Sequence, residues 1–249
     1  MLFSPLEQFS VISLLPIHLG SIDVSLTNSA VYCLLTAGCL WMVWSVLLYD
    51  GGLLIPCRYQ TACELIHDFV SSLANEQLSN NAQTYFPIVY TSFLYILISN
   101  LIGLIPFSFA TTAQLVLAFG MSFSLFIGVT LIGIQKHGLH FLSFFLPSGA
   151  PLWLAPLLVM IEFISYVFRP ISLGVRLFAN ITAGHSLLAI IAGFGWSMLS
   201  SGGIMMLASI IPVVVIVLVF GLELAVAFLQ AYVFGVLLCI YLKDAIELH

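Results

Sequence analysis

The sequence predicts an all-α membrane protein, because it is rich in apolar residues, poor in charge and divided into long hydrophobic runs. Hydrophobic residues make up 62% of the 249 residues and charged residues 6%, with a mean hydropathy of +1.20. A soluble domain carries about 25% charged residues. The net charge of −5 says little about nucleic acid, but the sequence contains no basic patch that could bind it. The five cysteines form no CxxC pair and are expected to act as small apolar residues.

Residues 1–249 are expected to form a single membrane domain with five transmembrane helices and one amphipathic surface helix. A crossing helix needs about 20 predominantly apolar residues. Residues 26–49 supply one such stretch, residues 86–135 supply two as a transmembrane hairpin, and residues 152–242 supply two longer ones. Within residues 60–75, apolar side chains recur at i, i+3, i+4 and i+7 opposite polar ones, which is typical of a helix at the membrane surface.

The last two hydrophobic runs, 152–196 and 204–242, are too long to cross a bilayer upright. At about 1.5 Å per residue the first would measure roughly 68 Å, against a hydrocarbon core of about 30 Å. We expect a long, strongly tilted antiparallel hairpin, with bends at Pro170 and Pro212, since proline removes a backbone donor. The alternative is that each run contains one crossing and a separate interfacial helix.

The few cations predict the orientation of the chain. With five crossings and the N-terminus outside, Arg58, Lys136 and Lys243 all lie at inner ends, as the positive-inside rule requires. Arg169 and Arg176 then remain within the membrane. No Lys or Arg precedes Arg58, so neither a secretory signal nor an import sequence is expected, which fits insertion where the chain is made.

Arg176 is the leading candidate for a functional residue. An arginine near the bilayer centre costs about 2.5–3.5 kcal/mol on insertion scales, so it faces a partner, a cavity or a transport path. Its guanidinium cannot lose its proton, so it can gate an ion route but cannot relay protons. Glu162 and Arg169 precede it at steps of seven residues and Asn180 follows one turn later, which places all four along one polar stripe.

A second set of polar residues predicts proton exchange. Antiparallel pairing of the last two runs would bring Glu223 near His185 at the outer end, with Glu162 toward the inner end. Histidine has an unperturbed pKa of about 6.5, and burial raises the pKa of a carboxyl group toward that value. Because Arg176 would block a straight proton leak, a proton must ride on a partner's carboxylate past it.

Each of these residues also has a structural interpretation. Glu162 and Arg169 could form an ion pair that only stabilises the fold. His185 and Glu223 could simply join two helices by a hydrogen bond. The amide side chains are common as contacts between membrane helices; they are Asn100, Asn180 and Gln230.

Four segments carry a resemblance to a known family. They are SPLEQF at residues 4–9, YFPIVYTSFLYILISNLIGLIPFSFATTAQ at 85–114, PLLVMIEFISYVFRPISLGVRLFANITAGHSLL at 156–188, and LELAVAFLQAYVF with the terminal YLKDAIELH. In these segments the chain resembles subunit a of rotary ATP synthases, also called subunit 6 of the mitochondrial membrane sector, in its fungal or general mitochondrial form.

The resemblance implies a role for each candidate residue. The arginine that matches Arg176 faces the ring of c subunits and separates two aqueous half-channels. His185 and Glu223 would belong to the outer half-channel and Glu162 to the inner one. Arg169 departs from the family pattern, in which an apolar or small residue often stands at this place. The amide residues that the resemblance implies near the arginine are Asn180 and Gln230.

The implied function is that of a proton-translocating stator subunit, whose half-channels protonate and deprotonate the c-ring to drive rotation and ATP synthesis. Expected partners are the c-ring, peripheral-stalk subunit b, other small membrane subunits and the lipid bilayer, with a dimer of the whole complex left open. No cofactor is expected. The chain contains no GxxxxGK[ST] loop, so it is not expected to bind nucleotide or to be an enzyme by itself. The expected location is the mitochondrial inner membrane, with the N-terminus in the intermembrane space and the C-terminus in the matrix, ahead of a bacterial plasma membrane.

Two other classes of protein were weighed against this function. A secondary transporter would show an inverted repeat with broken helices around a central site, and the two halves of this sequence show no convincing duplication. A structural scaffold would not need Arg176, His185 and Glu223 together.

Overall fold

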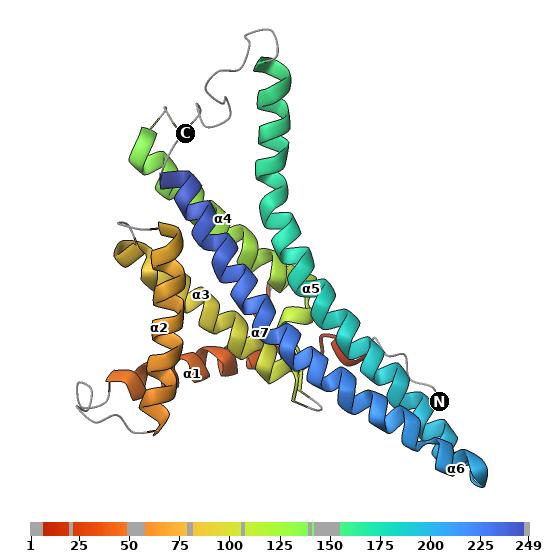
Figure 1. The fold of residues 1–249 in the computed structure, drawn as a ribbon. Coiled ribbons are helices and arrows are strands. Elements are labelled where there is room, and N and C mark those ends of the chain that lie inside the picture. The colour runs from red at the N-terminus through yellow and green to blue at the C-terminus, as the bar shows by residue number, and fades with distance from the viewer. Residues whose placement is uncertain are drawn as a thin grey trace. The chain divides into compact units, whose positions relative to one another are not determined.

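The computed structural model describes residues 7–19, 22–48, 58–78, 82–105, 108–138, 141 and 155–246 (Figure 1). Its helices confirm the all-α class. They are α1 (Asn28–Leu48), α2 (Arg58–Leu78), α3 (Ala82–Gly103), α4 (Leu115–His137), α5 (Ala155–Ser201), α6 (Ile204–Ala208) and α7 (Ile210–Ile246). The chain divides into two compact units. Unit 1 contains the described residues of 1–42, 95–114 and 177–231, and unit 2 contains those of 43–94, 115–176 and 232–249.

Four helical stretches in the described part of the chain are long and apolar enough to cross a membrane. They are Ala82–Gly103, Leu115–His137, Ala155–Ser201 and Ile204–Ile246. They correspond to the transmembrane hairpin and the long final pair expected from the sequence. The helix expected as the first crossing, at 26–49, is present as α1. It is not among these four, so the fifth crossing stays a prediction.

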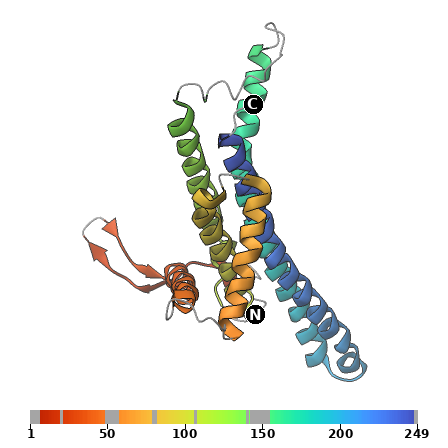
Figure 2. The ribbon, with the colours of Figure 1, turned by 60° about the vertical axis from the view of Figure 1, so that its left-hand side comes forward.

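The N-terminal part of unit 1 contains short strands that the sequence analysis did not predict. A short 3-10 helix, η1 (Glu7–Phe9), precedes them. The strand β1 (Ser13–Leu15) pairs antiparallel with β4 (Leu26–Thr27), and β2 (His18–Leu19) pairs antiparallel with β3 (Ile22–Asp23), as Figure 2 shows. Strands of two or three residues are too short to produce an alternating hydrophobic pattern.

In unit 2, α2 packs against α3 through one apolar face. The His67 ring contacts Phe86 and Tyr90 at centroid distances of 4.8 and 5.4 Å. Val70 and Leu73, from the predicted apolar stripe, are buried. Leu65 and Phe69, from the same stripe, are exposed. The helix is therefore present and extends beyond the predicted 60–75 at both ends, whereas its place at the membrane surface stays a prediction.

The predicted hairpin at 86–135 is displaced at its edges. Helix α3 begins earlier, at Ala82, and ends at Gly103. Beyond this end, the Ser108 hydroxyl lies 2.6 and 3.1 Å from the carbonyl oxygens of Ile102 and Gly103, and its one hydrogen is shared between these acceptors of the last turn. Helix α4 continues to His137, whose ring nitrogen lies 2.9 Å from the carbonyl oxygen of Ile246 on α7.

Helix α5 is a single helix of 47 residues with Pro170 inside it, so the alternative of two separate helices is wrong for the first long run. The second run contains the short α6 before α7. Gly202 and Gly203 make the turn with φ values of +70° and +62°, which glycine adopts without the steric cost of a Cβ atom. Pro212 lies in the first turn of α7, three residues after the break between α6 and α7 at Ser209, and the bends expected at Pro170 and Pro212 stay predictions.

Within unit 1, the C-terminal part of α5 and the N-terminal part of α7 run antiparallel, side by side (Figures 1 and 2). A Cβ atom built on Gly195 lies 3.4 Å from Pro212, and one built on Gly184 overlaps the carboxylate of Glu223. The two contacts are separated by the same number of residues on both helices, as antiparallel pairing requires. The antiparallel hairpin is therefore confirmed for this region, and its tilt in the membrane stays a prediction.

Candidate functional site

Unit 1 contains an open cavity of about 800 Å³ that is lined by residues from α1, α5, α7 and the segment after α3. Most of its lining is apolar. The ionisable side chains that line it are His185 on α5, Glu223 on α7 and Tyr32 on α1. The remaining polar lining residues are Gln8, Asn28 and Ser108. The structure therefore places in one cavity the two residues that the sequence predicted to lie near each other.

Glu223 is buried, with 7% of its surface exposed. Both of its carboxylate oxygens, and Nε2 of His185, are buried without a hydrogen-bond partner among the described residues. A buried polar atom without a partner costs about 1–3 kcal/mol. A cavity of this size has ample room for water, which occupies about 30 Å³ per molecule in the liquid. Both groups are thus placed to exchange protons with water in the cavity, and no hydrogen bond joins the two helices at this point.

The close approach of α5 to Glu223 depends on a glycine. A Cβ atom on Gly184, the residue before His185, would collide with Oε1 of Glu223. The lack of a side chain at this position lets the Glu223 carboxyl group lie directly against the backbone of α5. Unit 1 contains no Lys or Arg, so no permanent cation within this unit neutralises Glu223.

Two predicted amide residues are also buried in unit 1. Asn100 donates a hydrogen bond from Nδ2 to the carbonyl oxygen of Ala227 at 3.4 Å, which joins α3 to α7. Gln230 is buried one turn further along α7, and its Oε1 has no hydrogen-bond partner in the part of the chain that the structure describes. Asn100 therefore makes the interhelical contact that was weighed as its structural alternative.

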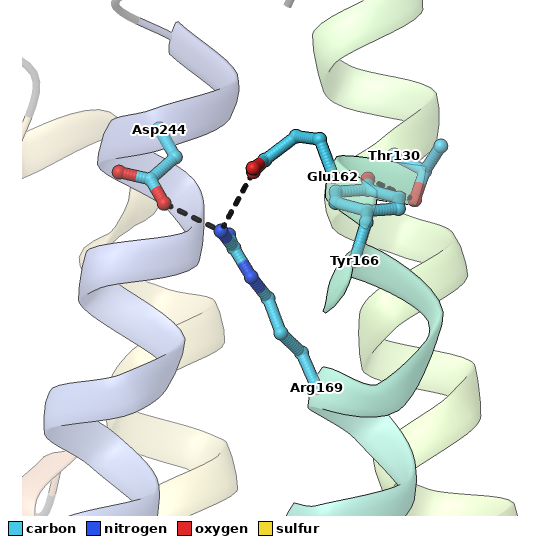
Figure 3. Close-up of polar contacts among 5 residues, drawn as sticks. All are labelled: Thr130, Glu162, Tyr166, Arg169 and Asp244. Carbon is cyan, nitrogen blue, oxygen red and sulfur yellow. Dashed lines mark hydrogen bonds and ion pairs between the residues drawn. The ribbon is translucent and has the colours of Figure 1, made fainter. Parts of the chain in front are cut away.

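Unit 2 contains a different polar site, here called the Arg169 cluster, which consists of Glu162, Tyr166, Arg169, Tyr241 and Asp244. Arg169 donates a hydrogen bond to Oδ2 of Asp244 at 2.9 Å and lies 3.8 Å from Oε1 of Glu162 (Figure 3). Its guanidinium carbon lies 5.8 and 5.5 Å from the ring centroids of Tyr166 and Tyr241, within the range of cation–π attraction. With two carboxylates and one guanidinium, the ionised cluster is net negative by one charge.

The Arg169 cluster confirms one prediction and adds a residue that sequence reasoning missed. The ion pair between Glu162 and Arg169 follows from their seven-residue spacing on one helix. Asp244 was missed because it lies 75 residues away on α7. The only signal in the sequence was an acidic residue at the end of an otherwise apolar run.

Arg176 lies on an exposed face of α5, in unit 2. It forms no hydrogen bond or ion pair with any residue that the structure describes. Two residues earlier, Gly174 is buried against α4, where a Cβ atom would lie 2.8 Å from the Ser122 hydroxyl and 3.3 Å from Phe119. Because two residues turn a helix by about 200°, Arg176 points away from α4. Asn180, one turn later on α5, is exposed as well.

The structure has the features of a membrane protein that moves ions. Its helices are long and apolar, a buried acid and a histidine line one cavity, and an exposed arginine lies on the helix that carries the histidine. Residues 29–243 match the family model described as ATP synthase A chain. The chain is 52% identical to ATP synthase subunit a of Marchantia polymorpha, with 99% of both chains covered. It is 49% identical to subunit a of Oenothera berteroana and 46% identical to that of Chondrus crispus, with 99% of this chain and 90% and 97% of those relatives covered. The chain belongs to the ATP synthase A chain family.

Membership of this family makes the chain the proton-translocating stator subunit of the membrane sector of a rotary ATP synthase. Its partners are the c-subunit ring and other subunits of that sector. The expected fungal type is corrected, because the relatives come from land plants and a red alga. Among the described residues, no three histidine, cysteine or acidic side chains are grouped in a way that could hold a metal ion.

Proposed function

We propose that this subunit provides two offset half-channels, and that the cavity in unit 1 belongs to the outer one. The observation that carries the proposal is the buried Glu223 beside His185 in this cavity, with polar atoms that have no partner in the described protein. A proton entering by water would bind Glu223 or His185 and pass to a carboxylate of the c-ring. Gln230, two turns beyond Glu223 on α7, would extend this polar route.

Arg176 is the proposed gate between the half-channels. Its exposure, and its direction away from α4, leave the guanidinium free to face a c-ring carboxylate. A permanent cation stabilises the carboxylate as an anion while it passes and repels a proton that would leak directly between the half-channels. Asn180 would lie beside the same partner surface.

The Arg169 cluster is the proposed inner half-channel. Glu162 and Asp244 provide two carboxylates that can accept the departing proton, and the excess negative charge of the cluster favours that acceptance. Arg169 would hold both carboxylates in place. Because the guanidinium cannot lose its proton, the proton must pass between the carboxylates or through water rather than through the arginine.

The finer features of the assembly belong to the same proposal. The subunit would lie in the mitochondrial inner membrane, with five crossings, its N-terminus in the intermembrane space and its C-terminus in the matrix. Peripheral-stalk subunit b and small membrane subunits would contact it, and the whole complex would be able to form a dimer. Nucleotide binding would take place on other subunits.

The decisive experiment measures reconstituted complexes that carry Arg176→Ala, with Val175→Ala as a matched control from the same exposed region. Proton leak, coupled ATP synthesis and subunit assembly are measured together. We expect normal assembly, loss of coupled synthesis and a passive proton leak that is retained or increased. The control should resemble the wild type. Unchanged synthesis in Arg176→Ala would refute the gate, and Arg176→Lys would show whether charge alone is sufficient.

A further inference from the structure

The segment before the first strand lies directly on His185. The ring of Phe9, at the end of η1, meets the imidazole of His185 edge-on, with centroids 6.2 Å apart and planes at 89°. Edge-to-face contacts between aromatic rings are favourable at centroid separations of about 4.5–7 Å and depend on the orientation of both rings. Phe9 therefore constrains the orientation of the His185 ring as well as covering it.

Phe9 is itself held by a second site in unit 1. Its carbonyl oxygen accepts a hydrogen bond of 2.9 Å from the side-chain amide of Gln114. The residue packs against a buried cluster of Ala110, Ala113 and Ile181. Ile181 lies one turn before His185 on α5, so Phe9 covers one continuous face of that helix.

The chain after Phe9 is anchored as well. The side chain of Asn28 accepts a hydrogen bond from the backbone N–H of Ile12 at 3.2 Å and donates one to the carbonyl oxygen of Ser10 at 3.1 Å. Asn28 also lines the cavity that contains His185. The backbone of this segment is thus fixed at Phe9 by Gln114 and one to three residues later by Asn28.

His185 needs such support because no described residue forms a hydrogen bond with its imidazole. Its Nε2 atom is buried without a partner. The terminal χ2 torsion of histidine is broad and roughly two-fold, so it does not define one ring orientation by itself. Packing must therefore determine which nitrogen faces Glu223 and the cavity.

We propose that Phe9, held by Gln114, is a positioning residue that fixes the His185 imidazole for proton exchange in the cavity. The proposal rests on the proposed outer half-channel. Phe9 and Gln114 would act by orienting the His185 ring, since neither of their side chains can carry a proton. The titratable groups that line the cavity with His185 are Glu223 from α7 and Tyr32 from α1. Glu7 lies on η1, two residues before Phe9, and is exposed.

The test compares substitutions that separate the ring from its apolar bulk. Phe9→Leu keeps an apolar side chain but removes the ring, whereas Phe9→Tyr keeps the ring. Gln114→Glu keeps the shape of the side chain but removes the donor to the Phe9 carbonyl. Val11→Ala alters an exposed neighbour and is the matched control.

The first readout is ATP synthesis by the assembled complex as a function of the pH on the outer side. We expect Phe9→Leu and Gln114→Glu to lower the rate about three- to tenfold, because small misplacements of a reacting group are costly, and to shift the midpoint of the pH profile. Phe9→Tyr should retain most of the rate and the wild-type midpoint. A purely structural role would change the amount of complex and leave the midpoint unchanged.

The second readout does not depend on proton transport. Acylation of His185 by diethyl pyrocarbonate is followed by peptide mass spectrometry, with His67 in unit 2 as the internal reference. We expect faster labelling of His185 in Phe9→Leu, with His67 unchanged. If both the midpoint and the labelling rate match the wild type, the proposal is overturned. If Phe9→Leu does not assemble, the pH midpoint and the His185 labelling rate of Gln114→Glu test the proposal in its place.

Failure of the half-channel itself would appear differently. Normal proton transport in His185→Ala would refute the proposed outer half-channel, whatever the Phe9 variants show. Loss of transport in His185→Ala, together with unchanged Phe9 and Gln114 variants, would preserve the half-channel and refute only the positioning role.

Discussion

The cavity in unit 1 and the Arg169 cluster in unit 2 both contain acidic side chains, but these side chains have different partners. In the Arg169 cluster, Glu162 and Asp244 both lie within ion-pair distance of one guanidinium. In the cavity, Glu223 has no permanent cation in its unit, and its oxygens have no partner among the described residues. The acids of the cluster therefore have a cationic partner within the protein, whereas Glu223 has none within its unit.

This difference assigns different demands to the two sites. In the proposed mechanism, the cavity accepts a proton onto Glu223 and later releases it to a partner. The Arg169 cluster would take up the proton that leaves. Substitutions at the two sites should therefore have different effects, on proton transport in the cavity and on stability in the Arg169 cluster.

The largest effect is expected from Glu223→Gln. Glutamine preserves the shape of the side chain but cannot bind and release a proton, so coupled ATP synthesis should fall about a hundredfold or more, as for loss of a positioned acid–base group. The rate is measured in reconstituted complexes after normalisation for assembly. Leu222→Ala, at an exposed neighbouring position, is the control. Near-normal synthesis in Glu223→Gln would remove the functional distinction between the two sites.

A smaller effect is expected from Gly184→Ala. The added methyl group would overlap the Glu223 carboxylate, so the carboxyl group must move away from α5. A displacement of this kind should lower synthesis about tenfold, since catalytic geometry is sensitive to shifts of about 1 Å. Gly193→Ala on the same helix is a close control, because its Cβ atom would meet nothing within 4 Å. Equal rates in the two variants would mean that the close approach at Gly184 has no functional role.

The long helices could be predicted from the sequence, because their apolar runs are long enough to cross a membrane. The ends of these helices could not. Helix α5 was expected to stop at 196 and continues to Ser201. In this last part the hydroxyls of Ser197, Ser200 and Ser201 donate hydrogen bonds to carbonyls three residues earlier, so these polar side chains find acceptors within the helix itself. Helix α7 passes its expected end at 242 and includes Asp244, whose charge is paired with Arg169.

The site was predictable to the extent that it depends on spacing along one helix or on the pairing of two adjacent helices. Glu162 and Arg169 share a face of α5, and His185 and Glu223 meet through the antiparallel hairpin. Phe9 and Asn28 could not be predicted, since their contacts cross large separations in the sequence and involve no repeated pattern. The roles proposed for all these residues remain predictions.

Arg169→Met tests how much the Arg169 cluster stabilises unit 2. Loss of the ion pairs and of the contacts with Tyr166 and Tyr241 should destabilise the folded subunit by about 2 kcal/mol, because all the groups are partly exposed and each interaction is weak. The measurement is the denaturant midpoint of the purified complex, with Arg169→Lys retaining the charge. A double-mutant cycle with Asp244→Asn isolates that pair. A coupling energy of zero in this cycle would contradict a stabilising ion pair between Arg169 and Asp244.

The smallest effect is expected from Thr130→Val, at the edge of the same cluster. The Thr130 and Tyr166 hydroxyls lie 2.9 Å apart and join α4 to α5 within unit 2 (Figure 3). Valine keeps the side-chain shape but removes this hydrogen bond, so the free energy of unfolding should fall by about 1 kcal/mol. Thr91→Val is the control, because the Thr91 hydroxyl bonds only to carbonyls of its own helix among the described residues. Proton transport should stay near the wild-type rate in both variants, since neither hydroxyl is an ionised carboxylate. A transport loss in Thr130→Val as large as in Glu223→Gln would mean that the Tyr166 hydroxyl belongs to the proton route, and that the Arg169 cluster does more than keep its carboxylates paired.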